Sequence, residues 1–281
     1  MKKRNKLLLI ILILFALIII GCLIYFTQPS PLVLKSSSLA TFKNIEYKKD
    51  RYLDILLPYE KKFSNIPVII FFHGGGFVAG SKKGVSDQLR KNSCEQLLKE
   101  GYALVSVDYY LARNSISSFP NCIEDCQESF SWVISHADEY GFDKNNIGLW
   151  GTSAGAQLAM MVGFTNSESV KFIIDEFGPV DFDKYLSLDF LGIFKKKAEK
   201  NSPINYVSIK SPPILILHGI DDKVVPYNQS KELIDKYLSF GNKEFKLISF
   251  KEAGHNLEGA SDEDKSKFNE EIVNFVLKKR Y

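Results

Sequence analysis

A serine held between two glycines is the first feature of this chain that could do chemistry. Residues 151–155 read Gly-Thr-Ser-Ala-Gly and follow the short apolar run 147–150. A strand that turns sharply into a helix needs glycines at the turn, because the backbone there is strained and the two elements pack closely. Such a turn exposes Ser153 as a candidate nucleophile, although a plain glycine-rich turn would show the same pattern.

A run of glycines after an upstream strand could complete that chemistry. The β-branched and aromatic run 67–72 predicts a buried strand, and it ends in His-Gly-Gly-Gly at 73–76. Acyl transfer through a serine builds negative charge on the carbonyl oxygen, which fixed N–H donors must stabilise. Gly75, Gly76 and Ala154 are the candidate donors. A flexible turn or a phosphate loop is the alternative, but no Lys-Ser or Lys-Thr follows, as a phosphate loop would require.

A general base and a carboxylate that could orient it occur further along the chain. Asp222 follows the predicted strand 213–217, and His255 follows the predicted strand 245–250. An imidazole can take the serine proton while a carboxylate holds the ring and stabilises its charged form. The order serine, acid, histidine is the one associated with this kind of serine turn.

The base can also be sought by elimination, because the chain has four histidines. His73 adjoins the glycines, and we expect it to fix their loop by hydrogen bonding. His136 lies in a polar stretch of a predicted helix, where a solvated surface side chain is expected. His218 ends a predicted strand, where a structural hydrogen bond is expected. His255 remains as the candidate base.

These motifs resemble the esterase and lipase group of the α/β-hydrolase superfamily, of the hormone-sensitive-lipase-like or BD-FAE-like type. The resemblance runs from about Ile45 to the C-terminus. Besides the serine turn and the His-Gly-Gly-Gly loop, it is carried by the segments 108–113, 119–132 and 140–147. It implies a serine carboxylesterase that needs no cofactor.

Position by position, the resemblance assigns roles to six residues: nucleophile Ser153, acid Asp222, base His255, and oxyanion-hole donors Gly75, Gly76 and Ala154. Asp221 is the rival acid. The family places its acid three residues before a Val-Pro pair, here Val225-Pro226, and this spacing favours Asp222. Thr152 stands where the group often has aspartate, and Ala156 stands where it often has glycine. Neither change removes a chemical function, so both bear on substrate preference.

A basic and then apolar N-terminus indicates a membrane segment. Four basic residues lie within residues 2–6, and the uncharged apolar run 7–26 that follows is twenty residues long. As a helix this run would span about 30 Å, the thickness of a bilayer core. We expect a single-pass anchor with its basic end in the cytoplasm and an extracytoplasmic catalytic body. The alternatives are a secretory signal or a lipoprotein signal, because residues 19–22 resemble a lipobox in which Cys22 would be lipidated.

Charge and composition exclude other partners. The formal net charge of +3 falls to about −1 once the four basic residues of the leader are set aside, which leaves no electrostatic footprint for nucleic acid. No His, Cys and Asp cluster has metal-ligand spacing, so neither a metal nor another cofactor is expected. Cys94, Cys122 and Cys126 leave one odd thiol in the body, and any pairing stays open. Cys122 and Cys126 share a predicted helix face, where buried packing is expected.

The predicted elements form one α/β domain. Apolar strands alternate with helices from the strand 52–57 to the helix 263–278, which is typical of a mostly parallel central sheet with helices on both faces. With the resemblance, this predicts an α/β-hydrolase fold. We expect a leader and membrane segment at 1–26, a tether at 27–43 and the catalytic domain at 44–281. The candidate catalytic residues follow strand ends, where such sheets bind ligands.

Together these features predict a membrane-tethered serine hydrolase that cleaves carboxylic esters through an acyl-enzyme intermediate. Its partners would be a small-molecule ester and, through residues 7–26, the lipid bilayer. Peptidases and amidases acting on small acylated amides use the same three residues, and an inactive hydrolase fold could serve as a surface binding module. An insertion at 181–205 is expected over the site. Its large apolar side chains would either line an acyl pocket or pack in the core: Phe182, Tyr185, Leu188, Phe190 and Phe194.

Overall fold

The computed structural model describes residues 41–112, 119–182 and 199–279. These residues all belong to one compact unit, Leu32–Tyr281, which is distinguished from an N-terminal unit, Met1–Pro31. The fold described below is that of the larger unit.

Two of the predicted features lie outside the described residues. One is the membrane segment 7–26 together with most of the tether, and the other is the greater part of the insertion, including Tyr185, Leu188, Phe190 and Phe194. In the part of the chain that is described, no helix combines the length and the apolar character that a membrane crossing requires.

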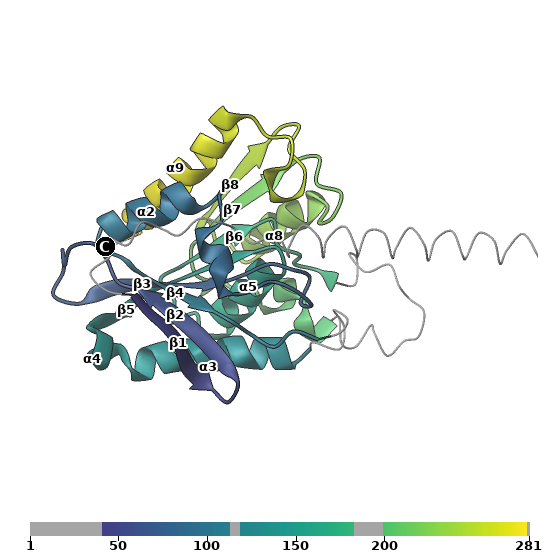
Figure 1. The fold of residues 1–281 in the computed structure, drawn as a ribbon. Coiled ribbons are helices and arrows are strands. Elements are labelled where there is room, and N and C mark those ends of the chain that lie inside the picture. Colours follow the sequence, from purple (N-terminus) through teal and green to yellow (C-terminus); the bar gives the residue numbers. More distant parts are fainter. Residues whose placement is uncertain (1–40, 113–118, 183–198, 280–281) are drawn as a thin grey trace, which may run out of the picture. The chain divides into compact units, whose positions relative to one another are not determined.

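A central sheet organises the domain (Figure 1). Within the described residues it has eight strands in the order β1-β2-β4-β3-β5-β6-β7-β8. In that order their bounds are Thr41–Lys48, Arg51–Leu56, Ala103–Val107, Ile66–Phe72, Phe142–Thr152, Phe172–Glu176, Ile214–Gly219 and Phe245–Phe250. β1 pairs with β2 and β2 with β4 in antiparallel fashion, and all the other neighbours are parallel. The predicted mostly parallel sheet is confirmed.

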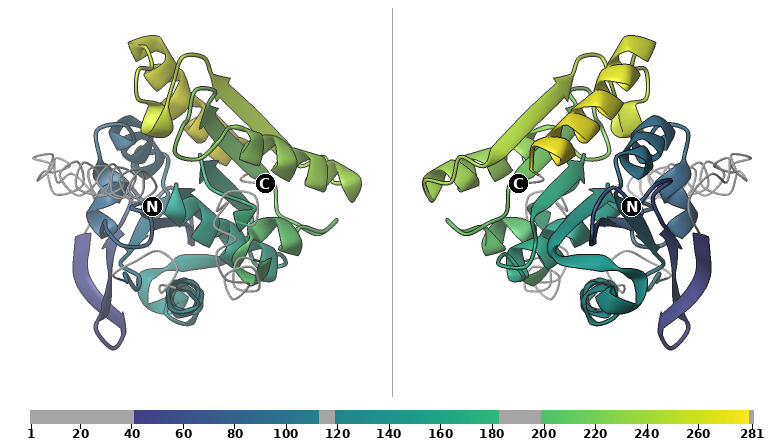
Figure 2. Two further views of the ribbon diagram at one scale, coloured as in Figure 1. Left: turned by 90° about the vertical axis from the view of Figure 1, so that its right-hand side faces the viewer. Right: turned by 90° about the vertical axis from the view of Figure 1, so that its left-hand side faces the viewer.

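Helices cover both faces of this sheet (Figures 1 and 2). On one face lie α2 (Lys91–Lys99) and α9 (Asp262–Lys278), and on the other lie α3 (Asn121–Ser135), α5 (Ala154–Thr165) and α8 (Asn228–Ser239). The shorter elements are α4 (Ala137–Tyr140) and the 3-10 helices η1 (Lys82–Ser86), η3 (Pro203–Tyr206) and η4 (His255–Leu257). This is the two-sided α/β layering that the alternating pattern predicts.

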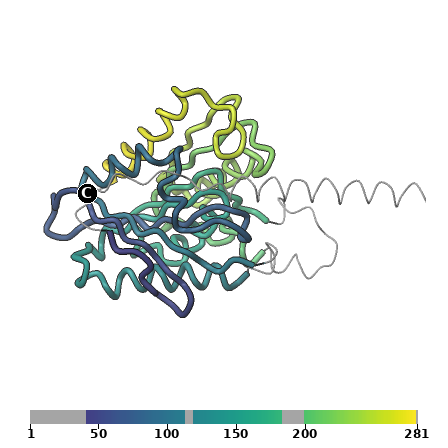
Figure 3. Tube along the Cα trace, viewed as in Figure 1, coloured from purple at the N-terminus to yellow at the C-terminus, as the bar shows by residue number. Residues whose placement is uncertain are grey.

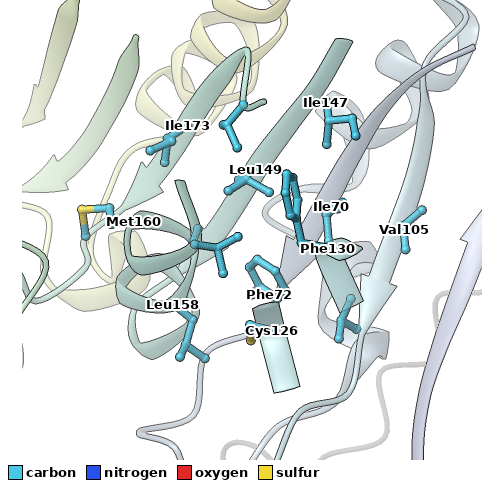
Figure 4. Close-up of a cluster of buried hydrophobic side chains, with 14 of the residues drawn as sticks. Ile70, Phe72, Val105, Cys126, Phe130, Ile147, Leu149, Leu158, Met160 and Ile173 are labelled. Atoms are coloured by element: carbon cyan, nitrogen blue, oxygen red, sulfur yellow. The ribbon is translucent and has the colours of Figure 1, made fainter. Parts of the chain in front are cut away.

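Four inner strands of the sheet are buried along their whole length because helices cover both faces of the sheet. Every residue of β3, β4, β6 and β7 is buried. Since side chains alternate along a strand, Ile70 and Phe72 join the core under α3 and α5, whereas Ile69 and Phe71 join the core under α2 and α9. Figure 4 shows the first of these cores, where Phe72 and Leu149 lie among side chains from several elements.

On the face covered by α2 and α9, these two helices, which are far apart in the sequence, are joined by hydrogen bonds. α2 and α9 lie side by side (Figure 3), and Asn269 of α9 links them. Its Oδ1 accepts the N–H of Ser93 at 2.9 Å, and its Nδ2 donates to the carbonyl of Leu89 at 2.8 Å. The beginning of α2 is thereby fixed to the last helix.

Two predicted boundaries are wrong. β1 begins at Thr41, inside the predicted tether, and it is mostly exposed, so its sequence lacks the apolar run by which the buried strands were recognised. The helix predicted to contain His136 is instead broken at that residue, which separates α3 from α4. Rather than being simply solvated, His136 stacks on Trp132 with ring centroids 4.1 Å apart, and its Nδ1 lies 2.9 Å from the Trp132 carbonyl oxygen.

The three cysteines of the body are free thiols. Cys94, Cys122 and Cys126 are all fully buried, so the packing predicted for Cys122 and Cys126 is confirmed. The Cys94 thiol donates to the carbonyl of Val85 at 2.9 Å.

Core packing in the central strands should dominate stability. Leu149 is 0% exposed and Leu238, on α8, is 47% exposed. We expect Leu149→Ala to lower the free energy of unfolding by about 2–5 kcal/mol, because it leaves a cavity between α5 and the sheet. The matched Leu238→Ala should change it by less than about 0.5 kcal/mol. Urea denaturation of the full-length protein measures both, and equal losses would contradict this account of the core.

Candidate active site

The turn between β5 and α5 places Ser153 in a strained conformation. Its φ is 53° and its ψ is −118°, values that a residue with a side chain rarely adopts. The glycines on either side are required by contact: a Cβ on Gly151 would lie 2.1 Å from the Gly155 carbonyl oxygen, and one on Gly155 would lie 2.0 Å from that of Phe72. The sharp turn expected from the sequence is present, and it leaves the Ser153 side chain at the edge of the sheet.

Three of the predicted site residues meet at this edge. His255 Nε2 lies 3.0 Å from Ser153 Oγ, and His255 Nδ1 lies 2.7 Å from Asp222 Oδ2. The three residues follow the carboxyl ends of β5, β7 and β8, which come together because these strands are parallel. Asp221 takes no part in this contact: it is exposed, and its N–H donates to the Ala253 carbonyl at 3.0 Å.

The hydrogen bonds fix the tautomer of His255. An ionised carboxylate can only accept a hydrogen bond, so Nδ1 of His255 carries a proton and donates it in a hydrogen bond to Asp222. Nε2 is therefore unprotonated and can accept a hydrogen bond from the Ser153 hydroxyl. This is the arrangement in which an imidazole can act as a general base toward a serine.

Asp222 is held in its charged form. Burial by itself would raise the pKa of this carboxyl group, but hydrogen bonds from His218 and His255 and from the backbone N–H of Val225 outweigh it and hold the pKa well below its usual range. Asp222 Oδ1 accepts the N–H groups of Val224 and Val225, both at 2.8 Å. Its negative charge is therefore available at any pH at which the imidazole is neutral.

His218 contributes more to the site than the sequence indicates. The expected structural hydrogen bond is present, since its Nε2 donates to the Val225 carbonyl at 2.9 Å and its Nδ1 lies 2.6 Å from Ser230 Oγ. The same Nε2 lies 3.3 Å from Asp222 Oδ2, a contact that we did not predict. The spacing of four residues between His218 and Asp222 is the only sequence signal for it.

The glycine loop lies directly against the serine turn. A Cβ on Gly74 would be 3.0 Å from the Thr152 carbonyl oxygen and 3.4 Å from Ser153 Cβ. Gly75 has a φ of +117°, Gly76 has a φ of +60°, and a Cβ on Gly75 would lie 2.1 Å from the Ala79 carbonyl oxygen. The loop therefore requires glycine at 75, and it runs beside the nucleophile candidate.

His73 braces this loop, as expected. Its Nδ1 donates to the Gly74 carbonyl at 2.6 Å, its ring stacks on Tyr109 with centroids 4.3 Å apart, and its own carbonyl accepts the Tyr109 hydroxyl at 2.6 Å. Burial lowers the pKa of His73 to about 4, against the smaller opposing effect of the bond to Gly74. His73 is thus a neutral side chain near pH 7.

Phe182 belongs to an aromatic cluster next to the glycine loop. Its ring centroid lies 6.1 Å from that of Phe77 and 5.6 Å from that of Phe119, and Phe77 and Phe119 are 4.8 Å apart. Phe182 is 3% exposed. Of the two interpretations given for the insertion, core packing describes this residue.

Among the described residues, no group of three or more His, Cys, Asp or Glu side chains is arranged to hold a metal ion.

This fold and the contact of Ser153, His255 and Asp222 at its sheet edge define an α/β-hydrolase. The model of the BD-FAE family matches residues 53–237, well over half of the chain, and the chain belongs to that family.

Esterases and a lipase are similar to this chain over part of its length. Esterase LipC of Mycobacterium tuberculosis is 25% identical over 222 residues, which cover 68% of this chain and 53% of LipC. The probable carboxylic ester hydrolase LipM of the same organism is 26% identical over 220 residues, covering 68% of this chain and 49% of LipM. Hormone-sensitive lipase of Mus musculus is 36% identical over 95 residues, or 34% of this chain and 12% of the lipase. This chain spans about half the length of the two mycobacterial relatives.

Solved structures share the fold. A truncated form of a carbohydrate esterase from gut microbiota has a TM-score of 0.72 at 24% identity, covering 89% of this chain and 100% of that one. The propionate-bound esterase Est2 of Thermogutta terrifontis has a TM-score of 0.70 at 23% identity, covering 88% and 96%. Both confirm the α/β-hydrolase fold predicted from the sequence.

The buried neutral state of His73 should make the glycine loop sensitive to acid. The folded protein resists protonation of His73 until about pH 4, whereas the unfolded chain takes up the proton near 6.5. The unfolded state therefore binds more protons between these values, and stability falls as the pH drops from 6.5 to 4. The two pKa values correspond to about 3 kcal/mol. We expect the stability difference between the protein and His73→Gln to shrink by about that amount between pH 7 and pH 4, measured by urea denaturation. A difference that stays constant with pH would contradict the assignment.

Proposed function

We propose that this chain is a serine carboxylesterase. His255 takes the hydroxyl proton of Ser153 while Ser153 Oγ attacks the ester carbonyl carbon, and His255 then gives the proton to the departing alcohol. Water, activated by the same imidazole, releases the acid from the acyl-enzyme. The observation that carries the proposal is the unbroken chain of hydrogen bonds from Ser153 through His255 to Asp222.

The proposal includes an oxyanion hole formed by the N–H groups of Gly75, Gly76 and Ala154. It is supported by the contact between the glycine loop and the serine turn, and by the position of Ala154 as the first residue of α5. N–H groups at the first turn of a helix have no acceptor within the helix and carry partial positive charge. Each such donor is typically worth about 2.7–4 kcal/mol of transition-state stabilisation.

The names of the relatives support an ester as the substrate. LipC is called an esterase and LipM a probable carboxylic ester hydrolase, and Est2 is solved with propionate bound. An amide-cleaving enzyme would use the same three side chains, so activity must separate the two. An inactive binding module is disfavoured, because all three side chains are present and in contact.

Ester hydrolysis should depend on Ser153. We expect the full-length protein to hydrolyse p-nitrophenyl butyrate, and Ser153→Ala to reduce kcat on the order of 10⁶-fold, because the nucleophile is lost. Ser169→Ala, which removes a hydroxyl from an exposed residue after α5, is the matched control and should keep full activity. Cleavage of p-nitroacetanilide in preference to the ester would replace the esterase by an amidase, and equal rates for the protein and Ser153→Ala would refute a serine hydrolase.

We further propose that residues 7–26 tether the enzyme to a membrane, with the catalytic domain on the extracytoplasmic side. The support is the twenty-residue uncharged apolar run and the basic residues before it. Lipidation of Cys22 is the alternative means of attachment.

Membrane attachment should depend on the apolar run. In bacterial cells that express the full-length chain, we expect the protein to remain with alkali-washed membranes and to be degraded by protease added to spheroplasts. Leu14→Arg combined with Leu17→Arg should release it, since an arginine in mid-span costs about 2.5–3.5 kcal/mol. The mass of the mature chain separates the two means of attachment: an intact N-terminus indicates an anchor, and a chain that begins at a lipidated Cys22 indicates a lipoprotein. A wild-type chain found in the soluble fraction would refute the tether.

A further inference from the structure

A buried arginine beneath the active site has no role in the mechanism above. Arg90 lies just before α2, and its side chain is 1% exposed. Its guanidinium pairs with Glu176, at the end of β6, whose side chain is 0% exposed. Arg90 Nε donates to Glu176 Oε2 at 2.7 Å, and Trp150 Nε1 donates to Glu176 Oε1 at 2.7 Å. A second carboxylate, Asp87, pairs with Nη1.

The same guanidinium contacts the neighbours of two catalytic residues. Nη2 donates to Thr152 Oγ1 at 2.8 Å and to Asn256 Oδ1 at 3.3 Å. Thr152 directly precedes Ser153, and Asn256 directly follows His255. One rigid planar group thus spans the nucleophile turn and the histidine turn.

A third connection runs through the main chain. The carbonyl of Glu176 accepts the N–H of Ser153 at 2.8 Å, so the residue that holds Arg90 also holds the nucleophile. The turns joined in this way are both strained, since Ser153 has a φ of 53° and Asn256 a φ of 56°. Strained residues persist only where their surroundings fix them.

A buried ion pair is a poor source of stability, because desolvation of the two charges offsets their attraction. A planar arginine fork with several acceptors instead fixes geometry, since each acceptor must lie at a set position around it. The acceptors of Arg90 are Asp87, just after η1, and residues on β5, β6 and η4.

We propose that Arg90 is a positioning residue that sets the distance between Ser153 Oγ and His255 Nε2 by holding both turns, through Thr152 on one side and Asn256 on the other. The proposal rests on the serine esterase function proposed above. Because general-base catalysis needs the imidazole within hydrogen-bond reach of the hydroxyl, loss of either link should slow the chemical step while leaving substrate binding in place.

The test removes each link without burying an unpaired charge. Thr152→Val keeps the shape and the strand preference of residue 152 but removes the hydroxyl, and Thr152→Ser keeps the hydroxyl. Asn256→Gly removes the other acceptor and tolerates the positive φ. Thr165→Val, at the far end of α5, is the matched control for loss of a threonine hydroxyl.

The readouts are kcat and KM for p-nitrophenyl butyrate and the rate of covalent labelling of Ser153 by a p-nitrophenyl phosphonate. The amount of label bound when the reaction is complete gives the fraction of molecules whose Ser153 can react, which are called competent sites below. We expect Thr152→Val and Asn256→Gly each to lower kcat per competent site and the labelling rate by about 10- to 100-fold with KM nearly unchanged, which is the scale of a misplacement near 1 Å. Thr152→Ser should restore both rates, and Thr165→Val should match the wild type.

The outcomes separate this inference from the proposed function. A wild-type protein that neither cleaves the ester nor takes the label would refute the esterase. An active wild type whose Thr152→Val and Asn256→Gly variants keep kcat per competent site would refute the positioning role alone. The same conclusion follows if the variants lose only the number of competent sites, because Arg90 would then support folding rather than geometry.

Discussion

The strained turn at Ser153 is the constraint on which the rest of the site depends. Its positive φ aims the hydroxyl away from the sheet, and the backbone pays for this with an unfavourable conformation. Three features compensate: the bond from the Ser153 N–H to the Glu176 carbonyl, and the close contacts made possible by Gly151 and Gly155. These contacts exist only because β3, β5 and β6 are parallel and end at one edge of the sheet. The geometry of the nucleophile therefore depends on the sheet topology.

The elements that could be predicted from the sequence are those marked by apolar and β-branched runs. β8 has the predicted bounds 245–250, although only Phe250 of this strand is buried. The exposed strand β1 carries polar residues and no apolar run, so the sequence places its first three residues in the tether. The contact among serine, histidine and acid was predictable, because each residue stands in a motif that follows a strand end.

The polar groups beneath the site were not predictable in this way. Arg90 and Glu176 are far apart in the sequence, and a charged residue at a strand end normally indicates exposure to solvent. Asp175 and Glu176 end β6, and the structure buries both completely. Their burial depends on partners that only the folded chain brings together, which no local pattern encodes.

The carboxylates near the site differ in charge because their partners differ. Burial raises the pKa of Asp175 to about 7, only partly offset by the N–H of Gly178 and the nearby His218, and its Oδ2 has no hydrogen-bond partner among the described residues. Asp222 is similarly enclosed, but His218, His255 and two backbone N–H groups keep it ionised. Near neutral pH the negative charge is therefore concentrated where two histidines face it. His218 contacts Asp222 and also acts electrostatically on Asp175, the carboxyl group that holds a proton over much of the acid range. Asp222 is therefore the anion that faces the imidazole of His255.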